Sequence, residues 1–238
     1  MLRIAEHFHD SDLGRQRQGN EDNYYVRAPL FVVADGMGGA QAGEVASAIA
    51  VEQFEQGLPD GEDPGEALAA LIRAANTRIH EQARSDAHHA GMGTTTTAAY
   101  LAADSVVVAH VGDSRCYRIR GGGIQQMTRD HSLLEDYKDA KPNMSEDEQR
   151  KFPHKNVITR ALGMRETVQV DVLAHDIQDN DVFLLCSDGL SGMIEDAKIM
   201  ELVKASADLE LAVSSLVEAA NEAGGTDNIT VLALQCAN

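Results

Sequence analysis

Short apolar segments recur along the chain and are typical of buried β-strands. They are rich in β-branched residues, are bounded by glycine or aspartate, and lie at residues 31–34, 95–101, 106–111, 182–186 and 229–234. In several of them successive residues are hydrophobic instead of alternating with polar ones, as expected for a sheet that is covered on both faces. The pattern therefore favours a layered sandwich.

Two longer segments carry apolar residues at the spacing of an α-helix. In the first, the repeat consists of Leu68, Leu71, Ile72, Ala75 and Ile79. In the second, a more approximate repeat consists of Leu209, Val213, Leu216 and Ala220. Both segments are predicted to form amphipathic helices.

A polar stretch from about Ser132 to Pro153 interrupts this pattern. It contains the sequence Lys-Pro-Asn and a helix-cap pair, Ser145 with Glu148 three positions later. We predict that residues 132–153 form a flap that governs the choice of substrate, because a polar loop near a site can vary without disturbing that site. The glycine-rich connector at 57–65 does not resemble an interdomain linker, so residues 1–238 are predicted to form one domain.

Charge and cysteine content narrow the classes of partner and compartment. With 38 acidic and 20 basic residues, the chain has a formal net charge of -18, which disfavours binding to nucleic acid and to anionic membranes. No stretch approaches the roughly 18 apolar residues of a membrane helix. Cys116, Cys186 and Cys236 lie far apart in apolar segments, which suits buried reduced thiols and a cytoplasmic location.

Five acidic motifs share one design. In each, an acidic residue lies where a predicted strand ends and glycine, asparagine or serine begins, and the motifs occupy residues 20–23, 34–39, 111–114, 186–189 and 226–228. A single Asp-Gly pair is most simply a turn. However, a strand end fixes the direction of a carboxylate, and an adjacent glycine lets a cation approach the backbone. Together the motifs indicate a rigid, oxygen-lined metal site assembled from distant parts of the chain.

The motifs also occur in a recognisable order over nearly the whole chain. They are Arg17 with NED at 20–22, DGMGG at 35–39, GTTTTAAY at 93–100, HVGDSRCYR at 110–118, TRDHS at 128–132, ITRALG at 158–163, SDGL at 187–190 and GGTDNITV at 224–231. This series resembles the protein phosphatase 2C family of metal-dependent protein phosphatases, in its bacterial, stand-alone form. The resemblance implies an α+β fold, a four-layer α-β-β-α sandwich in which helices flank two mainly antiparallel sheets.

The resemblance also implies a set of metal ligands. Asp35 matches the carboxylate that bridges two metal ions, and the Gly36 carbonyl matches a ligand of one of them. Asp188 and Asp227 match ligands of the other ion, while Glu21 resembles the acid on the Gly36 side. Hard oxygen donors suit two Mn²⁺ or Mg²⁺ ions, and the lack of a clustered His or Cys set argues against zinc.

Four further residues receive roles from the same resemblance. Asp22 is expected to be a neighbour of Glu21 or to orient the site. Asp113 resembles the ligand of a third, weaker metal ion, with Asp130 as its helper. Arg17 aligns with the arginine that binds the substrate phosphate, where a guanidinium can grip two oxygens and a lysine cannot.

The donor of the leaving-group proton stays open in the sequence. Many eukaryotic members of the family carry histidine at the position of Met37, whereas bacterial members commonly share the methionine. A metal-bound water is the preferred candidate, and His131 is the best alternative among the side chains.

The expected activity is hydrolysis of phosphoserine and phosphothreonine in proteins by a metal-bridging hydroxide, with Arg17 and Asp35 as the catalytic residues. Such an enzyme acts in signalling, opposes a cognate Ser/Thr kinase, takes phosphorylated proteins as partners and is expected to be a monomer. Two alternatives are a phosphatase of small phosphoesters and a non-enzymatic phosphoprotein-binding module of the same fold. A module of that kind is expected to have lost ligands, whereas Asp35, Asp188 and Asp227 are all present.

Overall fold

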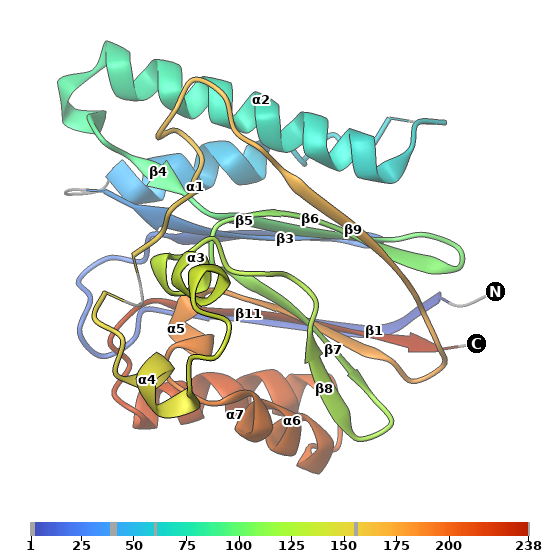
Figure 1. Cartoon of the computed structure of the whole chain (residues 1–238). Coiled ribbons are helices and arrows are strands. Elements are labelled where there is room, and N and C mark those ends of the chain that lie inside the picture. Colours follow the sequence, from blue (N-terminus) through green and yellow to red (C-terminus); the bar gives the residue numbers. More distant parts are fainter. Residues whose placement is uncertain (1–2, 39–41, 60, 155–156, 238) are drawn as a thin grey trace.

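Two antiparallel β-sheets pack face to face in the computed structural model, which describes residues 3–38, 42–59, 61–154 and 157–237 (Figure 1). The first sheet has the order β2-β3-β5-β6-β9, with β4 paired to β3. Its strands are β2 (Asp22–Arg27), β3 (Leu30–Met37), β4 (Gly93–Thr94), β5 (Thr96–Leu101), β6 (Ser105–Val111) and β9 (Asp171–Asp176). The second sheet has the order β1-β11-β10-β7-β8. Its strands are β1 (Arg3–Asp12), β7 (Arg115–Arg120), β8 (Gly123–Gln126), β10 (Val182–Cys186) and β11 (Ile229–Ala237).

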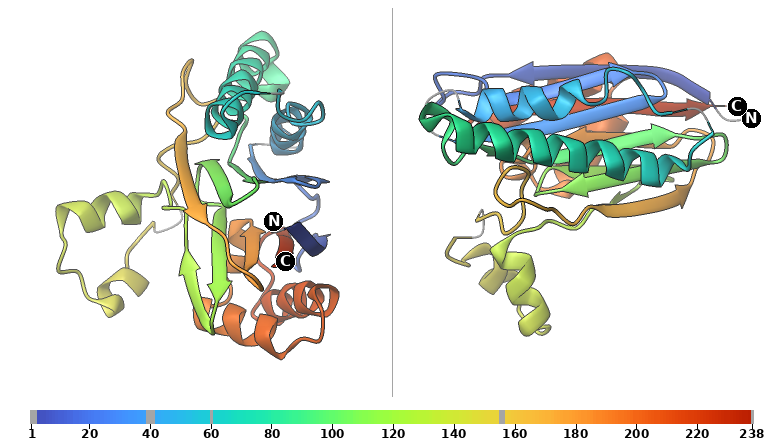
Figure 2. Two further views of the ribbon diagram at one scale, coloured as in Figure 1. Left: turned by 90° about the vertical axis from the view of Figure 1, so that its right-hand side faces the viewer. Right: turned by 90° about the horizontal axis from the view of Figure 1, so that it is seen from above.

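Helices cover the outer face of each sheet (Figures 1 and 2). The first sheet is covered by α1 (Ala42–Glu52) and α2 (Pro64–Ser85), which is followed by the short 3-10 helix η1 (Ala87–His89). The second sheet is covered by α6 (Asp196–Ala205) and α7 (Leu209–Glu222), while α5 (Asp188–Ser191) directly follows β10. The arrangement confirms the predicted four-layer α+β sandwich.

Burial on both faces explains the consecutive hydrophobic residues in the central strands. On β3, Val32 packs toward the helices of the first sheet, whereas Phe31 and Val33 pack into the layer between the sheets. On β10, Leu184 packs toward α6 and α7, and Leu185 packs between the sheets. Each such side chain contributes about 1.5–3 kcal/mol when it is fully buried, so both sheet faces hold the strands in register.

The two predicted amphipathic helices are α2 and α7. Asp63 caps α2 by accepting a hydrogen bond from the Glu66 N–H at 3.0 Å, and Pro64 occupies the first turn, where no backbone donor is needed. Asp208 caps α7 in the same way, through the Leu211 N–H at 2.8 Å. The apolar positions of both repeats face the sheets, which confirms these two predictions.

The polar stretch forms two helices that project from the sandwich (Figure 2). These are α3 (Leu133–Ala140) and α4 (Glu146–Arg150), and α4 begins with the expected capping box between Ser145 and Glu148. Two backbone hydrogen bonds close the base of this flap, from Leu133 to Val157 and from Thr159 to His131.

The three cysteines are buried and unpaired, as predicted. Burial raises the pKa of the Cys116 thiol to about 12. Among the described residues, no helix combines the length and the apolar character that a membrane span requires.

Candidate metal centre

Several strand ends bring the predicted acidic residues into one cluster. Asp22 opens β2 and is paired in register with Asp35, which lies near the end of β3. Asp188 opens α5 directly after β10, and Asp227 lies just before β11. The carboxylates of Asp22, Asp188, Asp113 and Asp227 all act electrostatically on Asp35. Segments separated by about 200 positions in the sequence therefore meet around one aspartate.

The Asp35 backbone is fixed by two threonines at the junction between β4 and β5. The Asp35 N–H donates to Thr95 Oγ1 at 3.1 Å, and its carbonyl accepts from Thr94 Oγ1 at 2.8 Å. Burial and the neighbouring carboxylates raise the pKa of the Asp35 side chain well above its ordinary value. The side chain is also hydrogen-bonded to Asp188.

Gly36 lies where only a glycine fits. A Cβ atom at this position would lie 2.2 Å from the Gly43 carbonyl oxygen and 2.5 Å from the Glu21 carbonyl oxygen. Gly43 packs as closely against Glu21, because its own Cβ would lie 2.7 Å from Glu21 Oε1. The Gly43 N–H donates to the Glu21 carboxylate, while burial raises the pKa of that group. The backbone of residue 36 and the Glu21 carboxylate consequently lie side by side.

Arg17 bridges two of the expected ligands. Its Nη2 donates to Asp227 Oδ2 at 2.6 Å, and its Nη1 lies 3.8 Å from Glu21 Oε2. The side chain is 45% exposed, so the guanidinium lies at the mouth of the acidic cluster. Burial and the nearby Asp227 raise the pKa of Asp188 to about 6.

Asp113 lines a neighbouring pocket and has one carboxylate oxygen that is buried. Its Oδ1 has no hydrogen-bond partner among the described residues, and burial raises its pKa to about 7. The pocket has a volume of about 240 Å³ and also contains Asp188, Arg115 and, from the flap, Glu135. An unpaired buried carboxylate oxygen is costly unless a cation or donor satisfies it. The site thus fits a bound cation.

The donor chemistry of the whole cluster fits hard divalent cations. Its side-chain ligand atoms are carboxylate oxygens, and the carboxyl groups raise one another's pKa because too little positive charge lies between them. Mn²⁺ and Mg²⁺ prefer oxygen ligands, and their charge would relieve this repulsion.

Comparisons with known proteins agree with this geometry. The model of the protein phosphatase 2C family matches residues 15–223. The chain belongs to the protein phosphatase 2C family.

Among relatives of this family, the serine/threonine phosphatase stp of Listeria innocua is 38% identical over 236 residues, covering 94% of this chain and 93% of the relative. The crystal structure of the Mycobacterium tuberculosis serine/threonine phosphatase PstP/Ppp matches with a TM-score of 0.92 at 34% identity, covering 100% of this chain and 99% of that one. The catalytic domain of PstP in complex with two manganese ions matches with a TM-score of 0.90 at 33% identity, and each chain is covered completely.

In this protein phosphatase 2C fold, Asp22 is the first residue of β2, and its side chain connects the two sheets. Its Oδ2 accepts from Ser187 Oγ at 2.7 Å and from Thr230 Oγ1 at 2.6 Å, and both partners are buried. Burial raises the pKa of Asp22 to about 7, although these two hydrogen bonds oppose the shift. These two hydrogen bonds suit the orienting role, one of the two predicted for Asp22, which stays a prediction.

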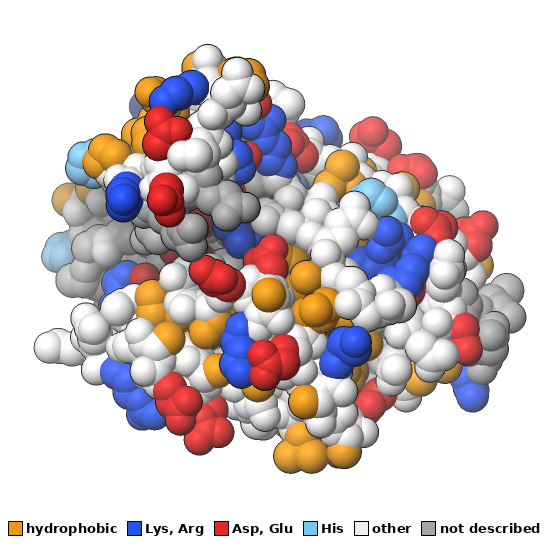
Figure 3. Space-filling model, turned by 60° about the horizontal axis from the view of Figure 1, so that its bottom comes forward, with side chains coloured by type: hydrophobic (Ala, Val, Ile, Leu, Met, Phe, Trp, Pro, Cys, Tyr) orange, Lys and Arg blue, Asp and Glu red, His pale blue; other side chains and the backbone are white. Residues whose placement is uncertain are grey.

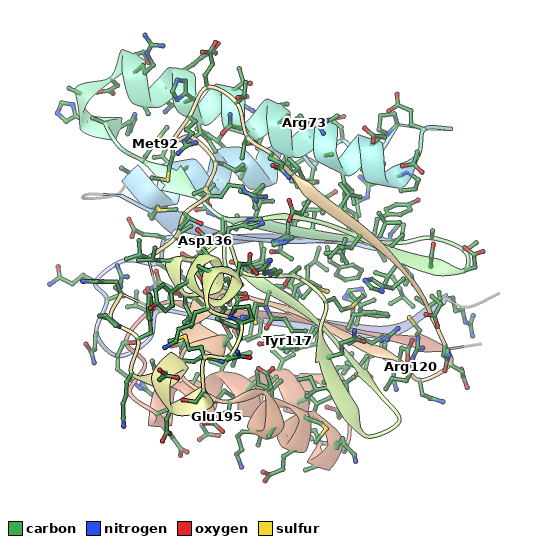
Figure 4. The ribbon with its side chains drawn as sticks, in the orientation of Figure 1. Arg73, Met92, Tyr117, Arg120, Asp136 and Glu195 are labelled. Atoms are coloured by element: carbon green, nitrogen blue, oxygen red, sulfur yellow. The ribbon has the colours of Figure 1, made fainter. Side chains whose placement is uncertain are left out.

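Asp130 lies at the pocket but its oxygens are occupied. Arg115 approaches it with Nε at 2.9 Å and Nη2 at 2.7 Å, and Gln126 Nε2 donates at 2.7 Å. The guanidinium also donates to the hydroxyl of Tyr117, which is labelled in Figure 4. Its oxygens accept from these protein donors, so Asp130 is the ion-pair partner of Arg115 at the edge of the pocket, and its role as a helper at a metal ion stays a prediction.

His131 has no ring nitrogen available for proton transfer to a leaving group. Its Nδ1 accepts from the Gly112 N–H at 3.0 Å, and its Nε2 lies 3.2 Å from Asp171 Oδ2. Burial lowers its pKa, so the buried ring is neutral. These contacts favour water over His131 as the proton donor, and the donor itself stays a prediction.

Asn228 was not among the predicted site residues, although it holds three segments together. Its Oδ1 accepts from the Glu21 N–H at 2.8 Å, and its Nδ2 donates to the carbonyls of Leu13 and Gly19. Its position directly after Asp227 was the available signal, because a polar residue beside a ligand often orients the ligand's neighbours.

Proposed function

We propose that the protein is a metal-dependent phosphatase that hydrolyses phosphoserine and phosphothreonine in proteins. The observation that carries the proposal is the convergence of Asp35, Asp188 and Asp227 with Arg17 at the mouth of the cluster. The names of the relatives, which are serine/threonine phosphatases, support the same substrate class.

We propose that two Mn²⁺ or Mg²⁺ ions are held by Asp35, the Gly36 carbonyl, Asp188, Asp227 and Glu21. When bound, such a pair supplies an acidified water molecule and neutralises phosphoryl charge. The manganese complex of the related PstP supports this assignment. Within the protein, the Thr95 and Thr94 contacts described above hold the Asp35 backbone, and so they fix the strand end from which the Asp35 carboxylate would bind the ions.

Arg17 is proposed to bind the phosphate of the substrate. Without a cation, its guanidinium compensates the charge of Asp227. Cation binding at Asp227 would compete with that ion pair, and the released fork would match two phosphoryl oxygens. We propose that the leaving oxygen takes its proton from water in the site, since both ring nitrogens of His131 are engaged.

The flap at 132–153 is proposed to choose among phosphoproteins. Leu134, Glu135 and Gln149 from the flap line the same pocket as Asp113 and Asp188, so a substrate segment at the metal centre would meet the flap. Asp136, labelled in Figure 4, lies on α3 of this flap.

We further propose that the protein acts as a single-domain cytoplasmic monomer in signalling and opposes a cognate Ser/Thr kinase. The buried unpaired thiols support a reducing compartment. On the face shown in Figure 3, Lys and Arg side chains are interspersed with acidic ones, which supports protein partners over nucleic acid.

The deciding experiment measures hydrolysis of a phosphothreonine peptide with Mn²⁺, with Mg²⁺ and with a chelator. Turnover is expected with either metal, none with chelator, and Asp35→Asn or Asp188→Asn should abolish it. An aryl phosphate measured in parallel tests the small-phosphoester alternative, which would show no preference for phosphoproteins. Metal binding without turnover on any substrate would sink the enzyme proposal.

A further inference from the structure

His131 binds both polar backbone groups of Gly112. Its own N–H donates to the Gly112 carbonyl at 2.8 Å, while its Nδ1 accepts from the Gly112 N–H at 3.0 Å. Gly112 adopts a φ of 113°, and a Cβ there would lie 2.5 Å from Thr95 Cβ. This tight turn directly precedes Asp113, so the direction of the Asp113 carboxylate depends on a contact made by His131.

The imidazole is itself held in one orientation. Because Nδ1 accepts a hydrogen bond, the proton lies on Nε2, which donates to Asp171 Oδ2 at 3.2 Å. The other oxygen of Asp171 accepts from Arg160 Nη1 at 2.6 Å. The ring also stacks on His110, with centroids 4.5 Å apart and an interplanar angle of 11°. Rotation of the ring would break its contacts with Asp171 and His110.

The same group could instead be considered a metal site, because His110, His131 and Asp171 offer ligand atoms within 4.8 Å of one another. Three features oppose this. His131 Nδ1 is occupied, the stacked rings are nearly parallel so that their in-plane lone pairs do not converge, and Arg160 places a cation on the carboxylate. The geometry suits a support better than a cation site.

We propose that His131 is a positioning residue for Asp113. By fixing the Gly112 turn, it holds the carboxylate of Asp113 beside the pocket that Asp188 also lines, and Asp113 Oδ1 has no hydrogen-bond partner in the part of the chain that the structure describes. A third, weaker divalent cation is the ligand that this oxygen would bind. The catalytic importance of that ion rests on the proposed function, whereas the positioning is a property of the fold.

Two substitutions separate positioning from packing. His131→Phe keeps the ring shape and its stacking on His110 but leaves the Gly112 N–H without an acceptor. His131→Asn keeps an acceptor near the position of Nδ1. The number of Mn²⁺ ions bound per chain and their Kd values would be measured by equilibrium dialysis, with Asp113→Asn as the reference that lacks the weak site.

The wild type is expected to bind one weak ion that Asp113→Asn removes. His131→Phe should raise the Kd of that ion by about 10-fold or more and leave the Kd values of the tight ions unchanged. In His131→Asn the Kd of the weak ion should stay within about threefold of the wild-type value. If His131→Phe does not fold, Asp171→Ala provides a second test. It removes the half-exposed carboxylate that accepts a hydrogen bond from His131 Nε2, and it should weaken binding of the same ion by a smaller factor.

Three outcomes would overturn the proposal. The first is that Asp113→Asn removes no bound ion, and the second is that His131→Phe weakens binding of every ion equally. The third is that the Kd of the weak ion is unchanged in both His131→Phe and Asp171→Ala. Phosphopeptide turnover is measured separately. Absent turnover with the expected pattern of ion binding would sink the proposed function and leave the positioning role standing.

Discussion

Two glycines make the close approach between Glu21 and the Asp35-Gly36 strand end. Position 36 has no room for a side chain because backbone oxygens of two other segments lie within 2.5 Å of any added Cβ. Backbone cannot withdraw as the tip of a flexible side chain can. This part of the metal centre therefore depends on the absence of a Cβ atom at position 36.

Gly36→Ala is expected to lower the free energy of unfolding by about 3 kcal/mol or more, or to prevent folding, because a methyl group would collide with backbone on two sides. Urea denaturation measures the effect. Gly19→Ala is the matched control, since nothing lies within 4 Å of its added Cβ, and it should change stability by less than about 0.5 kcal/mol. Equal effects of the two substitutions would contradict the argument.

Arg17→Lys should lower kcat/KM for a phosphothreonine peptide by about 10- to 100-fold, because a charged hydrogen bond contributes about 1.5–3 kcal/mol and lysine cannot form the bidentate fork. Binding of the two tight metal ions should persist. Arg15→Lys, two positions earlier and also exposed, is the control and should keep wild-type kinetics. Full activity of Arg17→Lys would remove Arg17 from the phosphate site.

At the scale of elements, the strands with continuous apolar runs and the two amphipathic helices were predictable, whereas three of the edge strands were not. β1, β2 and β9 lie at sheet edges. In β9 exposed and half-buried residues alternate, so it lacks the continuous apolar run that marked β10. Such strands are stabilised by pairing with a neighbour more than by their own composition.

The metal centre divides in the same way. Its carboxylates were predictable because a strand end followed by glycine is a local signal, as at Asp35. The orienting contacts were not, because the partners of Asn228 and Asp22 lie more than 160 positions away in sequence. The spacing of residues in the sequence does not indicate which hydroxyl or amide will contact a given polar group after folding.

Arg120 joins β7 to the end of β9 and the start of β10 (Figure 4). It donates to both oxygens of the fully buried Asp181, at 2.7 and 2.6 Å. Arg120→Leu should lower the free energy of unfolding by about 2–4 kcal/mol, because it leaves a buried carboxylate unpaired. Arg129→Leu, which breaks an exposed pair with Asp139, should cost less than about 1 kcal/mol. Comparable losses in thermal or urea unfolding would refute the distinction.

Exchange of residues 132–153 for the flap of another family member should change the order of preference among phosphoproteins. It should leave turnover of a small aryl phosphate within about threefold of the wild type, because the Asp35 cluster belongs to the sheets and not to the flap. Competition assays with two phosphoproteins measure the preference. Unchanged preference would assign substrate choice to another surface.

At the scale of the whole molecule, the fold brings buried carboxylates that repel one another to the place where the cations are proposed to bind. Burial raises the pKa of Asp22 and of Asp113 to about 7, and it raises the pKa of Asp188 to about 6. It also raises the pKa of Asp35 well above its ordinary value. These aspartates have a pKa near 4 in the unfolded chain. Between about pH 4 and pH 7, the metal-free folded state therefore binds more protons than the unfolded state does.

The sign of the resulting pH dependence follows directly. Because the native state holds the extra protons, the stability of the metal-free protein should fall as pH rises from about 5 to about 8, and each kcal/mol lost lowers Tm by about 2–4 °C. Saturating Mn²⁺ should raise Tm most at pH 8, where the carboxylates are ionised and ready to bind. Thermal unfolding at pH 5, 6.5 and 8, with chelator or Mn²⁺, measures both effects, and Asp113→Asn should flatten the metal-free profile. A metal-free Tm that rises over this range would mean that the cluster is not held as tightly buried as the structure shows, since hydrated carboxylates would repel too weakly to oppose folding.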